Sequence, residues 1–159
     1  MPRHSETRQL PYSPEQLFDL VADVARYGEF LPWVSAVRVR SNSDTEMVAD
    51  LVVGFKALRE KFTSRVVKDR PREIHVDYVD GPLKYLHNDW TFRPDGSGAT
   101  LVDFTVDFAF RNRLFEAIAG QWFDAALRKM IGAFETRARA LYDAEGASGI
   151  NSSSAQSAA

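Results

Sequence analysis

Residues 101–142 read LVDFTVDFAFRNRLFEAIAGQWFDAALRKMIGAFETRARALY, and the spacing of their apolar side chains changes once. Up to Phe110 apolar and polar side chains alternate, which is typical of a strand with one buried face. After Asn112, a residue type that favours the position just before a helix, apolar side chains recur every three or four residues. The stretch therefore predicts a half-buried strand followed by one long amphipathic helix.

The alternating pattern extends back from this stretch toward the N-terminus. It predicts a short strand at residues 6–10 and several strands between residues 34 and 100, separated by turn sequences rich in Pro, Gly and Asp. Strands with one apolar and one polar face are typical of an antiparallel sheet. We therefore expect about six or seven antiparallel strands whose apolar face packs against the long helix.

A shorter helix is predicted after the first strand. Ser13 is a suitable N-cap, Pro14 suits the first helical position, and apolar residues follow at helical spacing. We expect Gly28 and Pro32 to end this helix. Four large apolar side chains crowd around these two residues, although loops are usually polar: Tyr27, Phe30, Leu31 and Trp33. The segment is either a cap folded onto the core or a lip at the mouth of a cavity.

The composition is that of one ordinary globular domain: 159 residues, 45% hydrophobic, 26% charged and a formal net charge of −2. We expect a single domain over residues 1–143 and a disordered tail at 144–159, where the residues are small and polar. The absence of cysteine excludes disulfides and cysteine-ligated metals. The sequence shows neither a signal peptide nor a long apolar run, which predicts a cytoplasmic protein.

The aromatic content is high, with 11 Phe, 5 Tyr and 3 Trp. A strongly twisted sheet touches a helix along only part of its surface, so a void can remain between the two. Such a void, walled by aromatic side chains, suits a flat or isoprenoid apolar guest. The alternative is that the aromatic side chains simply fill the core.

Signals for catalysis are weak. His4, His75 and His87 do not fall at metal-ligand spacing, and the sequence has no glycine-rich phosphate loop, nucleophile elbow or HExxH motif. We therefore expect a protein that is not an enzyme and that has no metal site.

Three segments, in this order of elements, resemble the coenzyme Q-binding START-domain family of the polyketide cyclase/START-like superfamily. They are YGEFLPWVSAVRV at 27–39, GFKALREKFTSRV at 54–66 and GPLKYLHNDWTF at 81–92. The similarity runs from about residue 6 to residue 142. One departure is Val34, where many relatives have Cys; valine keeps that position apolar.

The resemblance implies an α+β helix-grip fold (START/Bet v 1-like), a curved antiparallel sheet around the C-terminal helix with short helices after the first strand. It also implies non-catalytic binding of ubiquinone or a related polyprenyl lipid, with no covalently bound cofactor. Such a protein would support respiratory electron transport as a quinone chaperone, with transient membrane contact at the inner face of the respiratory membrane.

Relatives also include bacterial proteins named as ribosome-association toxins. The alternative function is therefore binding of the large ribosomal subunit. The first half of the sheet is rich in basic residues that could meet RNA or anionic lipid, and interspersed acidic residues would pair with many of them. These basic residues are Arg38, Arg40, Lys56, Arg59, Lys61, Arg65, Lys68, Arg70 and Arg72.

Within the implied cavity, Asn88 is the best candidate for a polar contact, because alternation puts it on the apolar face of its strand. Tyr78 and Trp90 are secondary hydrogen-bond donors. The alternative is that Asn88 bonds to backbone groups at a bulge. The expected ring and tail contacts are Phe55, Phe104, Phe108, Phe115 and Trp122. The expected lip is Phe30, Leu31, Pro32 and Trp33.

Overall fold

The computed structural model describes residues 3–55 and 58–143, and for residues 55, 58, 114–115, 117–124 and 126–127 it describes the backbone alone. The expected tail at 144–159 lies outside the described residues. The elements in chain order are β1 (Arg3–Leu10), α1 (Pro14–Ala22), η1 (Val24–Glu29), β2 (Val34–Asn42), β3 (Glu46–Phe55), β4 (Leu58–Asp69), β5 (Glu73–Asp80), β6 (Leu83–Pro94), β7 (Thr100–Phe110), α2 (Arg113–Ala138) and η2 (Arg139–Asp143).

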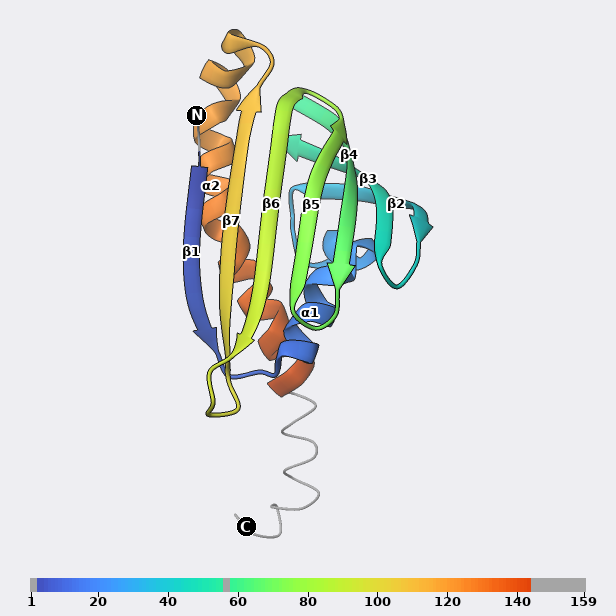
Figure 1. The fold of residues 1–159 in the computed structure, drawn as a ribbon. Coiled ribbons are helices and arrows are strands. Elements are labelled where there is room, and N and C mark those ends of the chain that lie inside the picture. The colour runs from blue at the N-terminus through green and yellow to red at the C-terminus, as the bar shows by residue number, and fades with distance from the viewer. Residues whose placement is uncertain (1–2, 56–57, 144–159) are drawn as a thin grey trace.

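The strands form one seven-stranded antiparallel sheet in the order β1-β7-β6-β5-β4-β3-β2. Figure 1 shows α2 beginning behind β1 and β7, with α1 near the lower end of the sheet. We call the sheet face toward α2 the inner face. The predicted helix-grip architecture is confirmed, because the switch from alternating to helical spacing falls where β7 ends and α2 begins.

The start of α1 agrees with the prediction, but its end does not. Ser13 forms a capping box: its hydroxyl accepts from the backbone of Gln16 at 3.1 Å, and its own N–H donates to the Gln16 side chain at 3.0 Å. The helix ends at Ala22, and Gly28 lies inside the 3-10 helix η1 instead of ending α1. The physical reason is local, since Asp23 leaves the helical conformation at ψ 64° and the Tyr27 hydroxyl then bonds back to the Val21 carbonyl.

Asp103 ties the edge strand β1 to the sheet on the face away from α2. Its carboxylate accepts hydrogen bonds from Thr7 at 2.7 Å, Thr91 at 2.9 Å and Arg93 at 2.8 Å. The bonds from Arg93, Thr7 and Thr91 lower the pKa of Asp103 to about 2, from an ordinary 3.8. A folded-state pKa below the unfolded one means that the carboxylate stabilises the fold above about pH 4 and that this contribution is lost as the pH falls toward 2.

We expect Asp103→Asn to lower the free energy of unfolding by about 1–2 kcal/mol at pH 7, a value reduced for solvent screening because the site is partly exposed. The difference from the unmodified protein should shrink as the pH falls from about 4 toward 2. Urea unfolding across this range measures it, with Asp44→Asn in the exposed β2–β3 turn as the control. A difference that stays constant with pH would contradict the assignment.

Candidate functional site

An apolar cavity of about 100 Å³ lies between the inner face of β3 to β6, η1 and the C-terminal half of α2. Its sheet wall consists of alternate residues of four neighbouring strands, among them Ala49, Ser64, Val76 and Asn88. These residues share a face because side chains alternate across a strand and the strands pair in register, Ala49 with Ser64 and Val76 with Asn88. The alternation in the sequence therefore places these four residues on the same wall of the cavity.

The opposite wall comes from the helices. Val21, Val24 and Tyr27 contribute from α1 and η1, and Met130 and Phe134 contribute from α2. An apolar cavity of about 150 Å³ accepts benzene, so the described space is close to the size of one small ring or isoprene unit. Phe55, Phe115 and Trp122, which were expected to line the cavity, have side chains outside the described part of the chain.

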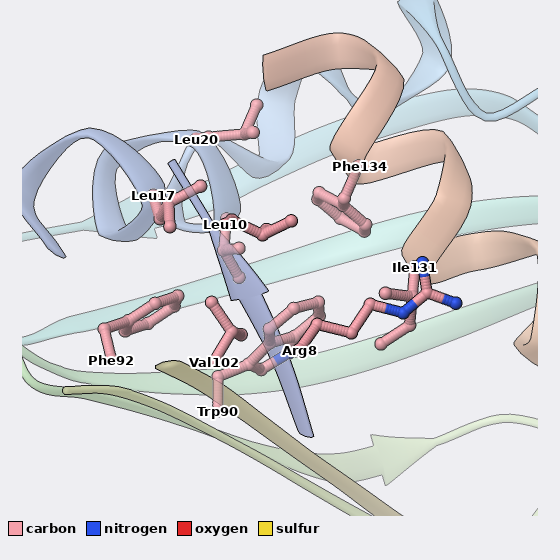
Figure 2. A pocket seen from close by; sticks show the side chains of 10 residues that line it. Arg8, Leu10, Leu17, Leu20, Trp90, Phe92, Val102, Ile131 and Phe134 are labelled. Carbon is pink, nitrogen blue, oxygen red and sulfur yellow. The ribbon is translucent and has the colours of Figure 1, made fainter. Parts of the chain in front are cut away.

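Trp90 and Phe134 separate this cavity from a smaller one. Their rings meet edge to face at 5.2 Å, and both line the two cavities. The smaller space, shown in Figure 2, has a volume of about 20 Å³ and lies among Leu10, Leu17 and Ile131. This volume holds at most about one water molecule. Its walls are mainly apolar, so it is a packing void, and the larger cavity is the candidate site.

Asn88 lines the larger cavity, as expected, and it also bonds to its neighbours. Its Nδ2 donates to the Thr105 carbonyl at 2.9 Å, and its Oδ1 accepts from Trp90 Nε1 at 2.8 Å. The amide therefore belongs to the cavity wall and also pairs with a backbone carbonyl, in a regular stretch of β6 and not at a bulge. Its contact with a guest stays a prediction. One N–H of the amide is left for a guest, whereas the indole N–H of Trp90 is already used.

Tyr78, Phe104 and Phe108 do not line the cavity. The Tyr78 hydroxyl accepts the Leu83 N–H at 2.9 Å, and burial raises the pKa of Tyr78. Phe104 and Phe108 are 1% and 4% exposed in the core. Phe104 packs beside Trp90 on the neighbouring strand, with ring centres 4.8 Å apart. These three side chains pack in or against the core outside the cavity wall.

The segment expected to form the lip is held partly in the core. Leu31 is buried at 2% exposure, and Phe30 packs on Phe134 with ring centres 5.1 Å apart. Trp33 is half-buried and its carbonyl accepts the Gly54 N–H at 2.8 Å, whereas Pro32 is exposed. The structure therefore anchors the segment through Leu31 and leaves Pro32 and part of Trp33 at the surface.

A second groove of about 220 Å³ lies outside η1, beside Phe30 and Leu141. Its walls carry charges of both signs, and each of these charges has a partner, Asp19 with Arg70 at 2.8 Å among them. Arg137 contacts Glu29 at 2.7 Å, and Arg26 contacts Asp23 at 3.2 Å. The groove mixes apolar residues with paired charges of both signs and has no surplus of one charge, so it is a weaker candidate for an apolar guest.

Among the described wall residues, the sequence singled out Asn88 and Trp90 as site residues and missed the others, including Ser64, Tyr27 and Phe134. Ser64 could have been found, because it is a hydroxyl residue between Phe62 and Val66 on the apolar face of β4. Tyr27 and Phe134 were recognised as apolar positions, and Phe134 was expected on the helix face that packs against the sheet, but nothing in the pattern placed either residue at a cavity.

The three histidines do not form a metal site in the described residues, where no cluster of three His, Asp or Glu side chains could hold an ion. His75 and His87 instead pair with Asp89 at 2.6 Å and Asp77 at 2.7 Å on the outer, exposed face of the sheet. Among the helices described, none is both long and apolar enough to span a bilayer.

Comparisons with known proteins agree on one group. A family model described as polyketide cyclase / dehydrase and lipid transport matches residues 10–135. The ribosome association toxin RatA of Rickettsia prowazekii is 38% identical over 137 residues, covering 84% of this chain and 93% of that protein. The mitochondrial coenzyme Q-binding protein COQ10 homolog B of Xenopus laevis is 34% identical over 143 residues, covering 87% of this chain and 59% of that protein.

A solved structure is similar as well. The solution structure of an 18 kDa protein from Caulobacter crescentus superposes with a TM-score of 0.70 at 41% sequence identity. The match covers 90% of this chain and 99% of that one.

Proposed function

Because the chain belongs to the polyketide cyclase/dehydrase and lipid transport family, we propose that it binds a polyprenyl quinone such as ubiquinone, without chemical change. The START-like family expected from the sequence is confirmed by this membership. The observation that carries the proposal is the apolar cavity between the sheet and α2. A relative of this chain is itself named as a coenzyme Q-binding protein.

The wall suits binding more than acid–base chemistry. In the described part of the wall the titratable side chain is Tyr27, whose hydroxyl donates to the Val21 carbonyl and whose pKa is raised by burial. Apolar burial supplies about 0.8 kcal/mol per CH₂ group, so one isoprene unit contributes about 3–4 kcal/mol. In this role the protein is a quinone chaperone that serves respiratory electron transport at the inner face of the membrane.

Native mass spectrometry and organic extraction test the proposal on protein purified from a quinone-producing host. We expect a roughly stoichiometric polyprenyl quinone, and quenching of Trp90 fluorescence when a short-tailed ubiquinone is added, because Trp90 lines the cavity. Purified protein that carries no lipid and shows no quenching would refute quinone binding.

A second candidate is contact with the ribosome, since one relative is named a ribosome association toxin. Several basic side chains of the sheet's first half are already paired: Arg40 with Asp50 at 2.8 Å, Arg70 with Asp19 at 2.8 Å and Arg72 with Asp69 at 2.8 Å. Lys56 lies outside the described residues. This pairing reduces the charge left for RNA.

The dependence on ionic strength distinguishes quinone binding from ribosome contact. RNA contact should weaken steeply as ionic strength rises, whereas capture of a neutral quinone should hardly change. Ribosome co-sedimentation and quinone quenching, measured over one salt series, therefore show which activity the protein has. Co-sedimentation that is lost at moderate salt, together with absent quenching, would favour the ribosome.

We expect the exposed part of the segment at 30–33 to meet the bilayer while the guest is exchanged, because Trp favours the membrane interface. Trp33→Ala should then slow quinone transfer between vesicles several-fold and change stability by less than about 1 kcal/mol, since Leu31 still anchors the segment. Leu31→Ala, which removes a core side chain, is the control that lowers stability. If Trp33→Ala instead lowers stability and affinity together, the segment is a cap.

A further inference from the structure

Ser64 differs from the other polar groups of the cavity wall. Its hydroxyl makes no hydrogen bond within the part of the chain that the structure describes, although the residue lines the cavity. The polar atoms of Asn88 and Tyr27 are bonded to neighbours. Ser64 therefore presents the free hydroxyl of this wall.

A hydroxyl in such a place has an energetic consequence. Ser64 is half-buried among apolar neighbours, with Ala49 paired beside it at 0% exposure and Val66 two residues along at 3% exposure. A guest that fills the cavity takes this hydroxyl out of water, which costs on the order of 1–3 kcal/mol when the hydroxyl is left without a partner. A guest whose oxygen accepts the hydrogen bond of Ser64 avoids that cost.

The position of Ser64 relative to Asn88 limits what that guest can be. Asn88 lies on β6, two strands away from Ser64 on β4. It is level with Val66 of β4, because Val76 of the intervening strand β5 pairs with both Val66 and Asn88. Ser64 is therefore offset from Asn88 by two strand spacings of about 4.8 Å across the sheet and by two residues of about 3.4 Å each along it. The Cα atoms of Ser64 and Asn88 are thus about 12 Å apart. Both side chains point from the same curved face, so their polar ends lie somewhat closer.

This separation fits a ring that carries an oxygen at each end. Two carbonyl oxygens on opposite sides of a six-membered ring are about 5 Å apart, given C=O bonds of about 1.23 Å. A hydrogen bond of about 2.8 Å at each oxygen brings the distance between the two donors to about 11 Å. The Ser64 hydroxyl and the remaining Asn88 N–H are placed to bracket such a ring.

We propose that Ser64 donates a hydrogen bond to a carbonyl oxygen of the guest and thereby selects a quinone-type ring over a plain hydrocarbon chain. This role of Ser64 rests on the proposed function, and it makes Ser64 the residue that recognises the ring of the guest. Trp90, which lies next to Asn88 in the wall, packs against the same guest.

Native mass spectrometry with two probes tests this proposal: a short-tailed ubiquinone and an isoprenoid hydrocarbon that has no oxygen. Ser64→Ala should weaken ubiquinone binding about two- to tenfold, the range of one neutral hydrogen bond, and leave hydrocarbon binding unchanged. Ser64→Thr, which keeps the hydroxyl, should retain the preference for the quinone. Ser41→Ala, on the exposed part of β2, is the matched control.

Thermal unfolding without ligand gives an independent readout. Ser64→Ala should melt at about the same temperature, because the hydroxyl is half-buried and makes no hydrogen bond within the described residues. If ubiquinone binds equally well to Ser64→Ala and to the unmodified protein, or if both probes lose affinity equally, Ser64 is not the donor, and quinone binding by the cavity still stands. If the unmodified protein binds neither probe, the proposed function itself fails.

Discussion

Replacing Phe134 with alanine lowers the free energy of unfolding by about 3–5 kcal/mol, the range expected when a buried phenylalanine is truncated. Phe134 is 5% exposed and is the meeting point of three aromatic rings, with centres at 5.3 Å for Tyr27, 5.1 Å for Phe30 and 5.2 Å for Trp90. It also lines both cavities, so its loss merges a space of about 100 Å³ with one of about 20 Å³. The enlarged void cannot collapse easily, because the rigid sheet forms one wall.

Urea denaturation measures this loss. Lys129→Ala on the exposed side of the same helix should change stability by no more than about 0.5 kcal/mol. A loss below about 1.5 kcal/mol for Phe134→Ala would mean that the neighbouring rings close the gap and that Phe134 does not fix the position of α2 over the sheet.

The fold could be predicted because its signals are local. The change of period between Phe110 and Arg113 marks a strand–helix junction whatever the rest of the chain does, and the structure places that junction there. The end of α1 could not be predicted in the same way. Gly28 reads as a helix breaker in isolation, but the chain has already turned at Asp23, and the contact between Tyr27 and Val21 holds the next turn in place.

The site was predicted less completely, because alternation shows which face a residue occupies and not what covers that face. Phe104 and Phe108 lie on the inner face, as expected, but β7 runs in front of α2 in Figure 1 and their side chains are buried in the core. The open part of the inner face lies over β3 to β6, where Asn88 and Trp90 were expected and are found. Which strands remain uncovered depends on the path of the helix.

Which polar side chain of the wall keeps a free hydrogen-bonding group could not be predicted from the sequence, for a related reason. Asn88 has the stronger hydrogen-bonding side chain, so the pattern favours it as the anchor. The structure shows most of that capacity taken up by Thr105 and Trp90, which leaves the smaller Ser64 with the free hydroxyl. The partners a side chain already has are set by tertiary packing, and alternation alone does not reveal them.

Filling the cavity is expected to abolish most of the quinone affinity and to leave the fold intact. Ala49 is fully buried on β3, lines the cavity and pairs with Ser64. Ala49→Leu adds three carbon atoms to a space of about 100 Å³ and displaces a similar amount of guest. At about 0.8 kcal/mol per carbon, the loss is about 2.5 kcal/mol, or about fifty- to a hundredfold in affinity.

The stability of this variant should change little, because side chains that fill a void often stabilise a protein by about 0.5–2 kcal/mol and this gain offsets the crowding. Val48→Leu, on the outer face of the same strand, is the matched control and should bind ubiquinone normally, since Val48 points away from the cavity. Fluorescence quenching gives the affinity of each variant, and urea unfolding confirms that each is folded. A folded Ala49→Leu protein that binds ubiquinone as tightly as the unmodified chain would place the guest outside this cavity, because three added carbons and a ring-sized guest cannot occupy the same space.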